Sequence, residues 1–204
     1  MPETTELTLS DRDALIVVDV QNDFLPGGAL AVTDGDRVIG PLNRAVTLFG
    51  TSGLPVFFSR DWHPPAHCSF TAQGGAWPPH CVADSYGAQF AAALDLPADA
   101  RVVSKGTRQD RDAYSALDGT DLPERLRAGG IRRLFVGGLA TDYCVKATVL
   151  DALAAGFEVV VLADAIRAVD VEPEDGERAI AAMRQAGVHM VSTGDLEPAP
   201  AATA

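Results

Sequence analysis

One stretch of the chain decides the fold: RRLFVGGLATDYCVKATVLDALAAGFEVVVLAD (Arg132–Asp164). Its first part, Arg132–Gly138, is short and apolar, which is typical of a buried strand. Residues 141–155 are amphipathic over the length of a helix, and Phe157–Asp164 again has the pattern of a buried strand. A strand, a helix and a second strand in this order predict parallel strands that are joined by a right-handed crossover.

The same alternation runs through the rest of the chain. Four more strands are predicted at Ala14–Asp19, Pro55–Arg60, Arg101–Lys105 and Val188–Thr193, with further helices near 36–49, 121–128 and 173–186. The sequence therefore predicts a single α/β domain over residues 1–204. We expect a three-layer, Rossmann-like fold with a six-stranded, mostly parallel sheet and helices on both faces. Flexible ends are expected at about 1–11 and 197–204.

Composition excludes several classes of protein. The chain has 204 residues, of which 47% are hydrophobic and 22% charged, and its net charge is −12. Such an acidic chain is poorly suited to bind nucleic acid or an anionic membrane surface. We find no signal peptide and no apolar run of about 18 residues that could span a bilayer. Three cysteines are too few for a disulfide framework, so we expect a cytoplasmic protein with reduced thiols. The sequence leaves open whether copies of the chain form a homo-oligomer.

Three residues at strand ends or a helix start suggest catalysis, because ligands of parallel α/β sheets bind beyond the carboxyl ends of the strands. Asp19 and Lys105 each end a predicted strand, and Cys144 lies in the first turn of a predicted helix. A helix start lowers the pKa of a thiol and offers free N–H groups to an oxyanion. Each residue alone also has a structural explanation: a strand-end cap, a snorkelling lysine or a buried small side chain. Together they predict a nucleophile, a general acid/base and an electrostatic partner.

The segment Arg60–Cys81 holds most of the residues that could bind a metal. Asp61 and His63 project to the same side of an extended chain, and His80 could arrive from the following loop. One carboxylate and two imidazoles suit Zn²⁺, Mn²⁺ or Fe²⁺. Two alternatives stay open: a structural zinc site that also uses cysteines of this segment, and a loop with surface histidines.

Five motifs in order carry a resemblance to a known family. They are IVVDVQNDFLPGGALAV (16–32), SRDWHPPAHCSF (59–70), WPPHCV (77–82), VSKG (103–106) with AYSAL (113–117), and GGLATDYCVKATVLDAL (137–153). The chain resembles the nicotinamidase branch of the isochorismatase-like cysteine hydrolases over residues 14 to about 164. The resemblance implies the isochorismatase-type fold.

The resemblance also implies roles for the residues in these motifs. Cys144 would be the nucleophile, Asp19 the general base and later the acid, and Lys105 the group that polarises the thiolate and orients Asp19. The backbone N–H groups of Ala140 and Cys144 would form the oxyanion hole, with a cis peptide bond before Ala140.

The metal and substrate residues follow from the same resemblance. Asp61, His63 and His80 would bind one divalent ion, with Zn²⁺ as the first expectation. Phe24 and Trp77 would sandwich a pyridine ring, and Tyr114 would line the pocket. Two prolines restrict the loop before His67, so we expect this histidine behind the ligands or at the surface.

The activity implied is the hydrolysis of nicotinamide to nicotinate and ammonia through a thioester on Cys144, with pyrazinamide as a second substrate. One alternative is another isochorismatase-like cysteine hydrolase that acts on a different small amide. A second alternative is a non-catalytic protein in which a zinc ion has a structural role.

Overall fold

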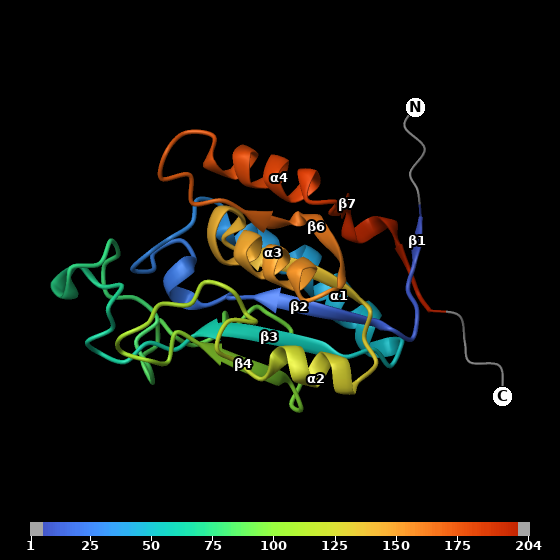
Figure 1. The fold of residues 1–204 in the computed structure, drawn as a ribbon, viewed down its shortest axis with the longest axis horizontal. Helices are drawn as coiled ribbons and strands as arrows, with labels where there is room; N and C mark the ends of the chain where they lie inside the picture. Colours follow the sequence, from blue (N-terminus) through green and yellow to red (C-terminus); the bar gives the residue numbers. More distant parts are fainter. Residues whose placement is uncertain (1–5, 200–204) are drawn as a thin grey trace.

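The computed structural model describes residues 6–199, and its centre is a six-stranded sheet (Figure 1). The strands are β2 (Asp13–Val18), β3 (Val56–Asp61), β4 (Arg101–Lys105), β5 (Arg133–Leu139), β6 (Glu158–Arg167) and β7 (His189–Val191). Their order is β4-β3-β2-β5-β6-β7, and every pairing in this sheet is parallel. The predicted parallel α/β sheet is therefore confirmed. The last strand is shorter than expected because residues 193–195 form a 3₁₀ turn, η5, that Ser192 caps.

Helices cover both faces of the sheet. They are α1 (Ile39–Thr51), α2 (Leu122–Ala128), α3 (Lys146–Ala154) and α4 (Asp175–Gln185). Alternate side chains of β2 explain the layers: Leu15 and Val17 pack in one core cluster with residues of α1, and Ile16 packs in a second cluster with residues of the other three helices. Because both faces are covered, all six residues of β2 are buried.

Short turns join the strands to the helices where the sequence pattern is irregular. Four of them are 3₁₀ turns: η1 (Asn22–Phe24), η2 (Gly35–Val38), η3 (Thr71–Gln73) and η5 (Thr193–Asp195). A fifth, η4 (Thr141–Val145), is a π-helical turn at the start of the predicted helix 141–155. A π-helical turn is rare and is often found at a functional site.

The two ends of the described chain pair with each other. β1 (Leu7–Thr8) and β8 (Leu196–Glu197) form a small parallel sheet, and the neighbouring Leu9 is buried in the core. This pairing involves residues of both ends for which flexibility is expected, 1–11 and 197–204. Residues 1–5 and 200–204 lie outside the described part of the chain. None of the helices within residues 6–199 combines the length and the hydropathy that a membrane crossing requires.

Candidate functional site

The carboxyl ends of four neighbouring strands bring the predicted catalytic residues together. Asp19 directly follows β2, Asp61 ends β3, Lys105 ends β4, and Cys144 lies in the π turn after β5. These strands are neighbours in the sheet (Figure 1), and contacts of Lys105 with Asp19, Asp61 and Cys144 bring the four side chains together at its carboxyl edge. All four are buried.

Lys105 is the hub of this cluster. Its Nζ lies 2.8 Å from Asp19 Oδ2, 2.5 Å from Asp61 Oδ1 and 3.4 Å from Cys144 Sγ. Burial opposes the charge on this lysine, but Asp19 and Asp61 outweigh it and raise the pKa of Lys105 well above its usual value. The side chain is therefore an ammonium group. The sequence predicted its contact with Asp19 but not its contact with Asp61, which joins the thiol site to the metal ligands.

Asp19 is built to accept a proton. Its backbone has a left-handed φ of 49°, and its Oδ1 accepts a 2.7 Å hydrogen bond from Ser59 Oγ. Its Oδ2 makes the ion contact with Lys105 but has no hydrogen-bond partner among the described residues. Burial raises the pKa of Asp19, and Asp61 adds to this rise while Lys105 opposes it. Carboxylate oxygens of Asp19 and Asp61 and the sulfur of Cys144 lie within 4.8 Å of one another.

Cys144 is a neutral thiol that needs a base. Burial raises its pKa well above the usual value for a cysteine, and the opposing effect of Lys105 does not cancel this rise. The expectation that the helix start would lower the pKa of this thiol is therefore wrong, because burial is the larger effect. The N–H groups of Tyr143 and Val145 both donate to the Ala140 carbonyl, which closes the π turn around Cys144. The Leu139–Ala140 peptide bond is cis, as the resemblance implied.

Asp61, His63 and His80 form a candidate metal site whose ligand atoms lie within 4.8 Å of one another. His63 Nδ1 is bonded to the Gly106 carbonyl at 2.9 Å, and His80 Nδ1 to the Pro78 carbonyl at 2.8 Å. Because a carbonyl oxygen only accepts, each ring carries its hydrogen on Nδ1 and keeps a lone pair on Nε2. This outer support is typical of histidines that bind a metal. The donor set therefore fits a divalent ion.

The charges of two of these ligands, Asp61 and His80, also suit a metal. Burial opposes ionisation of Asp61, but Lys105 and His63 outweigh it and hold the pKa of this carboxyl below its usual range. Burial lowers the pKa of His80, which favours the neutral ring that binds a metal. The alternative of a loop with surface histidines is wrong, because His63 and His80 are both buried.

His67 supports the site from behind. Its ring stacks on His63 with a centroid distance of 4.1 Å. Its Nε2 donates to the Arg111 carbonyl at 3.1 Å, so its Nδ1 accepts the 2.7 Å bond from Ser69 Oγ. Both ring nitrogens are thus used, and no lone pair is left for a metal. Within the described chain, the metal-ligand groups also leave out Cys68 and Cys81, which argues against the structural zinc site with cysteines.

A narrow, mostly apolar cavity opens beside the thiol. Phe24, Trp77 and Tyr114, the three predicted substrate residues, line it together with Cys144 and His80. Trp77 Nε1 donates to Tyr114 Oη at 2.9 Å, so two walls of the cavity support each other. Aromatic side chains make up much of the cavity lining, which suits a small planar ring.

Sequence analysis missed three residues of this cavity: Leu30, Tyr143 and Val169. Tyr143 lies edge-on to Trp77 with a centroid distance of 5.1 Å. Because Tyr143 directly precedes the predicted nucleophile, its position in the sequence could have marked it as a cavity residue. Leu30 and Val169 lie in loops whose sequence gives no such signal.

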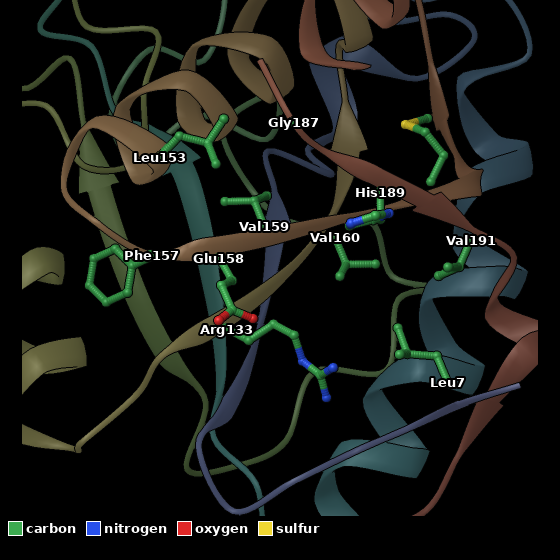
Figure 2. Close-up of a pocket in the computed structure, with 11 residues that line it drawn as sticks. Leu7, Arg133, Leu153, Phe157, Glu158, Val159, Val160, Gly187, His189 and Val191 are labelled. Atoms are coloured by element: carbon green, nitrogen blue, oxygen red, sulfur yellow. The ribbon is translucent and has the colours of Figure 1, made fainter. Parts of the chain in front are cut away.

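A larger groove lies at the opposite ends of the strands (Figure 2). Its walls are mostly apolar and include Leu7, Leu153 and Phe157. Arg133, the cationic residue of this groove, is already bonded to Asp13. We therefore place the chemistry of the protein at the cluster around Lys105.

A thiol, an acceptor carboxylate and an ammonium at the carboxyl edge of a parallel sheet define a cysteine hydrolase with an α/β fold. Residues 13–195 of the chain match the isochorismatase domain family. The chain belongs to the isochorismatase family.

Three relatives place the chain more closely within that family. The nicotinamidase of Escherichia coli is 42% identical over an alignment that covers 90% of this chain and 96% of that protein. The pyrazinamidase of Pyrococcus horikoshii, solved in complex with zinc, is 48% identical with a TM-score of 0.85 and covers 89% of this chain and 99% of its own. A protein of L. infantum, solved in complex with nicotinate, is 38% identical with a TM-score of 0.87 and covers 94% of this chain and 98% of its own.

Proposed function

We propose that this protein is a metal-dependent nicotinamidase, which hydrolyses nicotinamide to nicotinate and ammonia through a thioester on Cys144. One observation carries the proposal: the cluster of Cys144, Asp19 and Lys105 shares Asp61 with a metal-ligand set, and Cys144, Asp61 and His80 line the same aromatic cavity. The similarity of the chain to the E. coli nicotinamidase and the P. horikoshii pyrazinamidase supports the same substrate class. Pyrazinamide, which has a similar flat ring and a carboxamide, is the second substrate we infer.

In the first half of the reaction, Asp19 Oδ2 accepts the proton of the Cys144 thiol as the sulfur attacks the carboxamide carbon. Asp19 then gives this proton to the leaving nitrogen, and ammonia departs as the thioester forms. Lys105 stays an ammonium group throughout and stabilises the negative charge that moves between sulfur and carboxylate. The charge on the substrate oxygen is held by the N–H groups of Ala140 and Cys144, the oxyanion hole that we propose.

In the second half, Asp19 takes a proton from water, and the resulting hydroxide attacks the thioester carbon. The C–S bond breaks, nicotinate is released, and the proton on Asp19 returns to the Cys144 sulfur. Burial of the thiol and the carboxylate keeps other nucleophiles away from the thioester.

Asp61, His63 and His80 would hold the ion, with Zn²⁺ as our first choice and Mn²⁺ or Fe²⁺ accepted by the same donors. When bound, it supplies a Lewis acid that orients the ring nitrogen of the substrate. Phe24 and Trp77 would hold the faces of the ring, and Tyr114 would close the cavity beside it.

The direct test is ammonia release by the purified, zinc-loaded protein from nicotinamide and from benzamide, which lacks the ring nitrogen. We expect rapid release from nicotinamide and little from benzamide, and none from either with Cys144→Ala. Equal rates on both amides would support a cysteine hydrolase with another substrate. No release from either amide, together with an unreactive Cys144, would support a structural role for the metal.

The same proposal covers location and assembly. The three cysteines are free, which supports the cytoplasmic location inferred from the sequence. All residues named in the mechanism belong to one chain, so the reaction as proposed works in a monomer and in a homo-oligomer alike.

A further inference from the structure

The turn that follows Asp19 carries two polar side chains that the mechanism does not use, Gln21 and Asp23. Neither lines the cavity, and neither contributes a ligand atom to the candidate metal site. Both side chains form hydrogen bonds with the backbone of segments that carry metal ligands.

Gln21 clamps the backbone of Asp61. Its Oε1 accepts a 2.8 Å bond from the Asp61 N–H, and its Nε2 donates to the Asp61 carbonyl at 2.8 Å and to the Ala88 carbonyl at 2.9 Å. The side chain is fully buried, and these bonds use both N–H donors and the oxygen of its amide. The two bonds to Asp61 fix the backbone from which the ligand carboxylate projects.

Asp23 holds the segment that carries His80. Its Oδ2 accepts a 2.7 Å bond from the N–H of Cys81, the residue next to this ligand, and its Oδ1 accepts a 3.2 Å bond from Ala29. Cys81 has a left-handed φ of 46°, a conformation that a non-glycine residue adopts only with support from its surroundings. Gly87 packs against the Asp23 carboxylate so closely that a Cβ there would overlap it.

We propose that Gln21 and Asp23 are positioning residues of the metal site. Gln21 sets the place of Asp61, and Asp23 sets the place of His80, so a single short turn after the general base fixes the spacing of two of the three ligands. This inference rests on the metal site of the proposed function. Loss of such outer support weakens metal binding by about 10- to 100-fold in other proteins.

The test is the Zn²⁺ affinity of the full-length protein, measured by competition with a chromophoric chelator. We expect Gln21→Met and Asp23→Ala each to weaken binding by about 10- to 100-fold. Asp23→Asn keeps one oxygen for the Cys81 N–H and should fall between Asp23→Ala and the unchanged protein. The matched control is Asn22→Ala: Asn22 lies in the same turn, but its Nδ2 bonds the Tyr86 carbonyl, away from the ligands, so zinc affinity should stay within about twofold.

Two further measurements separate positioning from a general loss of structure. In the metal-free variants, the buried backbone groups left unpaired should lower the thermal midpoint, but unfolding should remain a single transition and the alkylation rate of Cys144 should stay close to that of the unchanged protein. In the zinc-loaded variants, KM for nicotinamide should rise more than kcat falls. Gly87→Ala adds a methyl group that displaces the Asp23 carboxylate while Asp23 itself is unchanged, so this variant should weaken zinc binding in the same way.

The outcomes are distinct. Unchanged zinc affinity in both Gln21→Met and Asp23→Ala would overturn the positioning roles and leave the metal site standing. Equal losses of zinc affinity in these variants and in Asn22→Ala would also overturn them, since the turn would then matter only for folding. No zinc binding by the unchanged protein would overturn the metal site and, with it, this inference.

Discussion

Lys105 Nζ contacts the Asp19 carboxylate, the Asp61 carboxylate and the Cys144 sulfur, so one ammonium group serves both the thiol and the metal ligands. The two carboxyl groups differ in their pKa. Burial raises the pKa of Asp19, whereas Lys105 and His63 outweigh burial at Asp61 and lower the pKa of that group. Two carboxyl groups whose pKa values are pushed apart can take different roles, one as a base and one as a ligand.

The raised pKa of Asp19 has a consequence for the pH dependence of the reaction. The base works only when ionised, so kcat/KM should fall on the acid side at a pH above the ordinary pKa of an aspartate. The hydroxyl of Ser59 stabilises the ionised form, so Ser59→Ala should move this fall to a still higher pH. The measurement is kcat/KM against pH at saturating zinc.

Ser104→Ala is the control for this prediction. Ser104 lies in the neighbouring strand β4 and accepts a bond from Arg60, so it should leave the acid limb in place. An acid limb that stays put or moves to lower pH in Ser59→Ala would show that Asp19 does not set it.

A second prediction at this scale concerns Gly106, which has a φ of 60° and lies against His63. A Cβ at this position would overlap the imidazole ring, so Gly106→Ala should displace the ligand and weaken zinc affinity by at least about 10-fold. Gly119→Ala is the matched control, because Gly119 has a similar φ of 68° but open space around it. Equal zinc affinities in the two variants would contradict the prediction.

At the scale of elements, the π turn η4 connects the nucleophile to a distant loop. Asp142 lies in this turn, and its carboxylate accepts bonds from the N–H groups of Val169 and Asp170 at 3.0 and 2.9 Å. Val169 lines the cavity beside Cys144. One turn therefore places the thiol and one wall of the substrate cavity together.

Asp142→Ala tests this coupling. The loss leaves two partly buried N–H groups without their acceptor, which costs about 1–3 kcal/mol of the free energy of unfolding. Because the loop then moves freely against the cavity, KM for nicotinamide should rise several-fold while the alkylation rate of Cys144 changes little. Urea unfolding and steady-state kinetics provide the two readouts, and an unchanged KM would contradict the coupling.

The six strands of the main sheet and the four helices could be predicted from the sequence to within a few residues, whereas β1 and β8 were not predicted. Strands such as β4 and helices such as α2 are marked by runs of apolar residues and by turns beside them, which are local signals. The grouping of Asp61, His63 and His80 was also predicted, because Asp61 and His63 project to the same side of an extended chain and the family resemblance implied His80 as the third ligand. Contacts such as Ser59 with Asp19 could not be predicted, since they join residues 40 apart in sequence.

The pKa of Cys144 shows why local reasoning fails at such a site. The helix start is a local feature, and it favours the thiolate. Burial among Asp19, Asp61 and Lys105 is set by the whole fold, and its net effect on the pKa is opposite and larger. The π turn was missed for the same reason, because the pattern of residues 141–155 is helical throughout.

At the scale of the whole molecule, the ion pair of Arg133 with Asp13 connects the short strand β1 to the main sheet. Arg133 bonds the Asp13 carboxylate and the Thr8 carbonyl, so it links β5, β2 and β1. Asp13 is fully buried and also accepts bonds from the N–H and the hydroxyl of Ser10. This cluster lies at the strand ends opposite the active site.

Asp13→Ala should therefore lower stability without changing the chemistry. It leaves an arginine and other donors without their partner, which should cost about 2 kcal/mol or more in urea unfolding. The rate of nicotinamide hydrolysis per folded molecule should stay close to that of the unchanged protein. Arg108→Ala removes an exposed pair with Asp110 and should leave the unfolding midpoint unchanged. A loss of activity without a loss of stability in Asp13→Ala would contradict this separation.

The order of the strands in the sheet also determines when they can pair during synthesis of the chain. β2 emerges early from the ribosome, but its neighbour β5 begins at Arg133, 120 residues after its partner Asp13. Until β5 is synthesised, one edge of the most buried strand has no partner, and parallel pairings over such separations form slowly. Nascent chains that stop before β5 should therefore bind chaperones and lack hydrolase activity. Cys144 is synthesised only after β5, the strand that gives β2 its second neighbour, so the nucleophile follows the central pairing of the sheet, and β6 and β7 are then added at its edge.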